Sequence, residues 1–241
     1  MAADPPEIFL VGVDESLGKL GDYVLSKGPL IDKRWGVSVT GPTELLLRKM
    51  GLGTLARLSV WERDALKRIH ENALGNVLSL IRSLNPVPDF VLVADDCASY
   101  EGPLLPSWYI EEVYLSSHEF LAEEIRSVGA AAFLHADGNY GSYFREIGRI
   151  WDLIHPLDIH PRGDLTDYMS WLRAAARIRS KIDSTIATGI AFELGSEELI
   201  VRAVKELLKW DVGDMVLSNF HPPLGELDVR MLVGMIRNAL S

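Results

Sequence analysis

Residues 130–138 read AAAFLHADG, an apolar run that ends abruptly in polar residues and glycine. The same pattern recurs along the chain, with longer stretches of helical spacing between the runs. A strand followed by a helix, repeated in this way, indicates parallel strands joined by right-handed crossovers, and continuous apolar strands indicate a sheet covered on both faces. The runs are IFLVGVD (8–14), WGVSVTG (35–41), DFVLVADD (89–96), AAAFLHADG (130–138), LIHPLDIH (153–160), STIATGIAF (184–192) and DMVLSNFH (214–221).

The segments between these runs are amphipathic. In residues 55–84, apolar side chains from Leu55 to Ile81 fall at roughly helical intervals. Residues 110–129 and 197–210 show the same spacing, and Gly129 is a good helix stop. We therefore expect helices over these three segments.

Two architectures fit alternating parallel strands and helices: an open doubly wound sheet and a (β/α) barrel. No GxGxxG sequence follows the first run, which weakens a dinucleotide-binding interpretation. We therefore expect an α/β fold in which residues 1–241 form a single TIM-type (β/α) barrel domain. Only seven strand runs are visible, so the eighth strand is missing, hidden in residues 17–31 or irregular. A missing strand would leave a barrel that is shortened at its N-terminus.

Composition limits the function further. The chain has 241 residues, 48% of them apolar, and a formal net charge of -10. A surface of that sign does not attract a nucleic-acid backbone or an anionic membrane, so we expect neither as a partner. A single cysteine, Cys97, excludes an internal disulfide, and no signal peptide or membrane-spanning stretch is apparent. These features predict a cytoplasmic protein.

Polar side chains end several of the strand runs. In a (β/α) barrel the carboxyl ends of all strands meet at one mouth, where the active site forms. We therefore expect convergence there of Asp14, Asp95, Asp96, His135, Asp137, Asp158, His160 and His221.

The spacing of these residues predicts which way some of them point. His135 and Asp137 lie two residues apart and point the same way, as metal ligands or as an acid/base pair. The alternative is structural: His135 hydrogen-bonds within the barrel and Asp137 caps the next turn. One of Asp95 and Asp96 can face the mouth while the other faces the helices, or both can brace the loop. His155 is expected on the opposite strand face or lower in the barrel.

Several stretches resemble the uroporphyrinogen decarboxylase superfamily, which also contains zinc-dependent methyltransferases acting on methylated corrinoids and the barrel of cobalamin-independent methionine synthase. The stretches are VSVTGPTELLL (37–47), ADDCASYEGPLLPSWYIEEV (94–113), FLHADGN (133–139) and LSNFHPPLGELDVRMLVGMI (217–236). The resemblance implies a barrel whose site lies at its mouth.

The methyltransferases hold zinc with a His-x-Cys pair and a later cysteine, and the metal activates a substrate thiol. His135 matches their histidine, while Asp137 and His221 stand at the two cysteine positions. His160 could be a fourth ligand. The resemblance thus implies a divalent metal, zinc or a harder ion, and a methyltransferase-like activity on a small-molecule substrate. Any corrinoid would be brought by a partner protein.

The decarboxylases offer a second match, which needs no metal. They carry a histidine in a setting like that of His221, and Asp14 could be their pyrrole-binding aspartate. Arg48 stands where they have a tyrosine, and the pair Asp95 and Asp96 opens their substrate loop. The resemblance gives the predicted catalytic residues Asp14, Asp95, Asp96 and His221, and the predicted substrate-binding residue Arg48. Tyr140, which follows Asn139, could line the mouth, so these two residues are also predicted to bind substrate.

A third interpretation follows from the absence of both family cysteines. The chain could be a non-catalytic partner subunit of a corrinoid methyltransferase system. Apolar surface left exposed by an incomplete barrel would then favour a homodimer.

Overall fold

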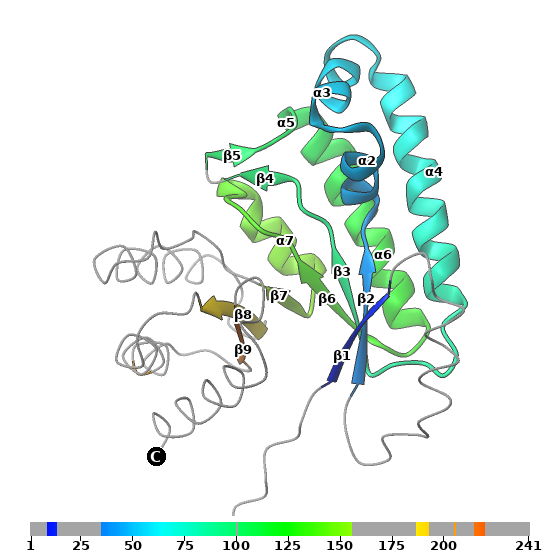
Figure 1. The fold of residues 1–241 in the computed structure, drawn as a ribbon, viewed down its shortest axis with the longest axis vertical. Helices are drawn as coiled ribbons and strands as arrows, with labels where there is room; N and C mark the ends of the chain where they lie inside the picture. The colour runs from blue at the N-terminus through cyan, green and yellow to red at the C-terminus, as the bar shows by residue number, and fades with distance from the viewer. Residues whose placement is uncertain are drawn as a thin grey trace, which may run out of the picture.

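Seven parallel strands form one sheet, in the order β1-β2-β3-β6-β7-β8-β9 (Figure 1). The computed structural model describes residues 9–13, 35–99, 101–155, 187–192, 205 and 215–219. Each strand lies within one of the seven apolar runs, so the predicted strands are confirmed. The strands are β1 (Phe9–Val13), β2 (Trp35–Thr40), β3 (Phe90–Ala94), β6 (Ala131–His135), β7 (Leu153–His155), β8 (Ala187–Phe192) and β9 (Met215–Asn219).

The order of the strands in the sheet is their order in the sequence. In a doubly wound sheet the order of the strands reverses at a switch point, whereas the order of the seven described strands does not reverse. The sequential order is the one that a (β/α) barrel requires. Among the described residues β1 does not pair with β9, so closure of the barrel stays a prediction.

Helices follow β2, β3 and β6. The long helices α4 and α6 lie side by side (Figure 1). A two-stranded antiparallel ribbon, β4 (Ala98–Ser99) and β5 (Gly102–Pro103), leads from β3 to the next helix. The helical elements are α2 (Pro42–Met50), α3 (Leu52–Trp61), α4 (Arg63–Arg82), α5 (Ser107–Tyr109), the π-helical turn η1 (Ile110–Tyr114), α6 (Leu115–Ser127), the 3-10 turn η2 (Gly141–Tyr143) and α7 (Phe144–Ile150).

The core lies between one face of the sheet and these helices. Along β2, β3 and β6 alternate residues are at most 4% exposed: Val37, Val39, Val91, Val93, Ala132 and Leu134. They belong to one apolar cluster with residues of α4 and α6, namely Leu66, Val77, Ile81, Leu121 and Ile125. Because side chains alternate along a strand, the residues between the buried ones share the opposite face, where they are partly exposed.

The helix predicted over residues 55–84 is two helices. Glu62, with φ −139° and ψ 52°, separates α3 from α4. Trp61, the last residue of α3, is 72% exposed. The helix predicted over 110–129 is confirmed: it ends at Ser127, and Gly129 has the left-handed φ of 97°. Residues 17–31 and, except for the helical Lys205, residues 197–210 lie outside the described residues.

In the described part of the chain, no helix has both the length and the apolar character needed to cross a membrane.

Candidate metal site

The site forms where β3 and β6 end. The two strands are parallel neighbours with Ala94 opposite His135, and the Asp95 amide donates a hydrogen bond of 2.9 Å to the His135 carbonyl. Alternation along these strands continues past their ends. Asp96 and Asp137 therefore share the face of Ala94 and His135, while Asp95 is turned toward the helices.

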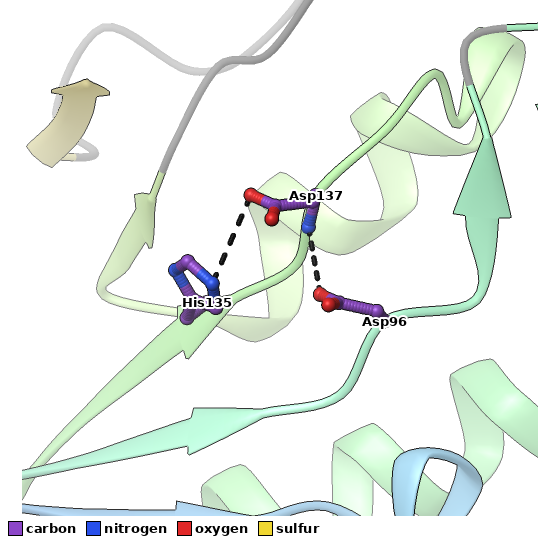
Figure 2. Close-up of side chains that lie close together, drawn as sticks. All are labelled: Asp96, His135 and Asp137. Carbon is purple, nitrogen blue, oxygen red and sulfur yellow. Dashed lines mark hydrogen bonds and ion pairs between the residues drawn. The ribbon is translucent and has the colours of Figure 1, made fainter. Parts of the chain in front are cut away.

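Three side chains meet at this edge of the sheet (Figure 2). Asp96, His135 and Asp137 each offer one ligand atom, and these atoms all lie within 4.8 Å of one another. His135 Nε2 lies 3.7 Å from Asp137 Oδ1, and the Asp137 amide donates to Asp96 Oδ1 at 2.8 Å. The structure thus brings together the predicted ligands His135 and Asp137, and adds Asp96, which the sequence suggested as a catalytic residue.

The chemistry of these atoms fits a divalent cation. Asp137 Oδ1 is buried and accepts no hydrogen bond from the described residues, which is a costly state for a carboxylate oxygen. Ligands about 2 Å from a shared ion lie within about 4 Å of one another, so a small closing movement would bring all three atoms to one ion. One imidazole and two carboxylates suit zinc or a harder divalent ion.

The electrostatics of the site also favour a cation. The pKa of Asp96 is raised from 3.8 to about 7, mainly by burial. The hydrogen bond from the Asp137 amide lowers this pKa, whereas the charges of Asp137, Glu44 and Asp95 contribute to the rise. Several carboxylates therefore oppose ionisation of Asp96, and a bound cation would reverse that effect.

A second imidazole lies beside the site. His155 on β7 is in register with His135, and their Nδ1 atoms are 2.9 Å apart. The ring centroids are 5.2 Å apart with an interplanar angle of 27°. Burial, and then the neighbouring His135, lowers the pKa of His155 from 6.5 to about 3, which keeps it neutral. His155 was predicted on the opposite strand face or lower in the barrel, and this prediction is wrong. Residues in register on parallel strands point to the same face, so the rings of His135 and His155 lie on one face at the same level.

Asp95 lies on the other side of the strand and is fully buried. Its Oδ1 accepts a hydrogen bond of 2.7 Å from the Glu44 amide in the first turn of α2, and its Oδ2 lies 2.9 Å from His118 Nε2. Trp151 Nε1 donates to His118 Nδ1 at 3.2 Å. Of the two adjacent aspartates, Asp96 is therefore at the edge of the sheet, whereas Asp95 holds β3 to the helix layer.

Gly41 makes room for Asp95. A Cβ at position 41 would lie 2.4 Å from the Cβ and Cγ of Asp95, far inside van der Waals contact. The Gly-Pro pair that ends the second strand run therefore has a packing role: glycine lets the buried carboxylate approach, and Pro42 begins α2.

The predicted substrate-binding residues fall in different surroundings. Tyr140 is 1% exposed, and its hydroxyl accepts a hydrogen bond of 2.8 Å from the Cys97 amide. Alternation along the chain buries Tyr140 and leaves Asp137 and Asn139 partly exposed. The Tyr140 ring packs against the rings of Tyr114 and Phe144. Asn139 is partly buried, and its Oδ1 accepts from the Gly141 amide at 3.0 Å. The exposed Arg48 pairs with Glu44 through its Nε at 2.7 Å.

Asp14, His160 and His221 lie outside the described residues. The backbone of β9, which precedes His221, is separated from β6 by β7 and β8 in the sheet.

Comparison with known proteins shows a likeness of fold. No protein-family model matches the chain, and no curated protein matches it in sequence. A methyltransferase from Methanosarcina mazei aligns over 93% of this chain with a TM-score of 0.69 and 16% identity. The chain spans 64% of the length of that methyltransferase. A citrate lyase from Burkholderia xenovorans aligns over 99% of this chain and 78% of its own, with 10% identity and a TM-score of 0.40, too low to support an argument.

Proposed function

We propose that this chain is a metal-dependent enzyme of methyltransferase-like activity, with a divalent cation held by Asp96, His135 and Asp137. The observation that carries the proposal is the meeting of these three ligand atoms within 4.8 Å, one of them a buried carboxylate oxygen without a hydrogen bond. The fold likeness to a methyltransferase supports the same class of enzyme. The sequential order of the parallel strands supports a single TIM-type barrel over residues 1–241, with the site at its mouth.

The residues of the site would bind the ion and orient its ligands. His135 would offer Nε2, which already faces Asp137 Oδ1 at 3.7 Å. The hydrogen bond from the Asp137 amide fixes Asp96 Oδ1 and so orients the Asp96 carboxylate. When bound, the ion would act as a Lewis acid that lowers the pKa of a substrate thiol or of water. His160 and His221 are the proposed additional ligands, and a corrinoid-carrying partner protein is the proposed methyl donor.

Metal analysis of the purified chain tests the proposal. We expect protein purified without chelator to retain about one divalent ion per chain, and the apo-protein to bind Zn²⁺ or Mn²⁺ in calorimetric titrations. Asp137→Ala and His135→Ala should each weaken this binding by more than about 100-fold, because losing a direct ligand costs more than the 10–100-fold typical of an outer-shell partner.

Asp64→Ala is the matched control, since Asp64 is an exposed carboxylate in the first turn of α4. It should bind metal like the wild type. Folded wild-type protein that binds neither ion would contradict the proposal and favour a metal-free decarboxylase or a non-catalytic subunit. Carbon dioxide release from a porphyrinogen would then distinguish these two.

A further inference from the structure

Metal binding would determine which ring donates the hydrogen bond between His135 and His155. Their Nδ1 atoms are 2.9 Å apart, and a hydrogen bond between two ring nitrogens needs one N–H and one lone pair. A metal ion binds only an unprotonated ring nitrogen. If His135 Nε2 holds the ion, the single proton of the neutral ring is on Nδ1. His135 Nδ1–H then donates, and His155 Nδ1 accepts.

We propose that His155 is a positioning residue for the metal site: it accepts the Nδ1–H of His135 and so directs Nε2 toward Asp96 and Asp137. This inference rests on the proposed function. A metal-bound histidine commonly donates its other N–H to an acceptor that fixes the tautomer and the ring orientation. The parallel register of β6 and β7 supplies that acceptor from the neighbouring strand.

A neutral imidazole at position 155 is compatible with the net charge of the metal site. Asp96 and Asp137 already supply two carboxylates, which balance a divalent ion. A carboxylate at position 155 would add a third negative charge beside these two, more than a divalent ion balances. A neutral imidazole accepts the same hydrogen bond without adding charge.

Two substitutions distinguish a role of His155 as hydrogen-bond acceptor from a role in packing alone. His155→Asn keeps an acceptor, because the amide oxygen can take the place of Nδ1. His155→Leu keeps a side chain of similar size but has no acceptor. Co²⁺ is a suitable probe for both variants of the full chain, since its visible absorption reports the geometry of the ligands as well as the affinity.

We expect His155→Leu to bind Co²⁺ 10–100-fold more weakly than wild type, with an altered visible spectrum. His155→Asn should bind within about threefold of wild type with an unchanged spectrum, because it restores the acceptor. A Leu variant that matches wild type, or an Asn variant as weak as the Leu variant, would overturn the role of His155 and leave the metal site standing. Failure of the wild type to bind Co²⁺ would instead overturn the site itself.

A measurement on the wild type keeps the inference testable even where a variant does not fold. In Zn²⁺-loaded protein labelled with ¹⁵N-histidine, His135 should show a metal-bound Nε2 and a protonated Nδ1, and His155 an unprotonated Nδ1. Coordination through His135 Nδ1, or a proton on His155 Nδ1, would contradict the inference.

Discussion

Adjacent residues in this chain have different roles because strand alternation separates them. Asp95 and Asp96 are neighbours, yet one is enclosed among helices and the other faces Asp137. A tryptophan indole can only donate, so the bond from Trp151 makes His118 Nδ1 the acceptor. The His118 proton is therefore on Nε2, and it needs the Asp95 carboxylate as its acceptor.

This arrangement predicts opposite outcomes for two matched substitutions. In Asp95→Asn, one amide must accept from the Glu44 amide and also face the N–H of His118, so a buried donor is left unpaired. We expect a loss of about 2–3 kcal/mol in the free energy of unfolding. Asp96→Asn keeps the acceptor for the Asp137 amide and should change it by less than about 1 kcal/mol. Urea denaturation of metal-free protein measures both. Equal losses would contradict the assigned proton on His118.

At the scale of elements, the buried His70 of α4 is hydrogen-bonded to Tyr109 of α5 and to Ser117 of α6. Ser117 Oγ donates a hydrogen bond to the Val113 carbonyl. It therefore acts as the acceptor in its hydrogen bond of 2.7 Å with His70 Nε2. His70 Nδ1 then accepts from the Tyr109 hydroxyl at 2.8 Å. Burial lowers the pKa of His70 from 6.5 to about 4. The charge of Asp95 opposes this shift, and His118 adds to it.

The lowered pKa of His70 predicts how stability depends on pH. Between pH 6.5 and about 4 the unfolded chain binds a proton that the folded chain does not. The free energy of unfolding should therefore fall as pH falls through this window, by up to about 3 kcal/mol from this residue. His70→Gln, which cannot be protonated, should remove this part of the dependence. Denaturation of both proteins at several pH values tests it, and parallel curves would contradict it.

For the whole molecule, the strand order brings together residues that are distant in sequence. Asp96 and Asp137 follow the ends of different strands, and only the pairing of β3 with β6 makes them neighbours. An ion bound by both would join these two strand ends in the folded state alone. Metal binding should therefore stabilise the native protein by mass action.

Thermal unfolding with and without metal tests this coupling. With Zn²⁺ at about 100 times its dissociation constant, we expect about 2.7 kcal/mol of added stability and a midpoint higher by about 5–10 °C. Asp137→Asn should lose most of this increase. An equal increase in this variant would show that the ion binds elsewhere.

The sequence by itself determined the strands, their parallel class and one half of the site. Apolar runs ending in polar residues are local features, and the two-residue spacing of His135 and Asp137 puts them on one face of β6 whatever the neighbours are. The break at Glu62, the buried place of Tyr140 and the partners Asp96 and His155 were decided by the tertiary structure. Register between strands and packing of helices depend on contacts between segments far apart in the chain, and no local pattern encodes them.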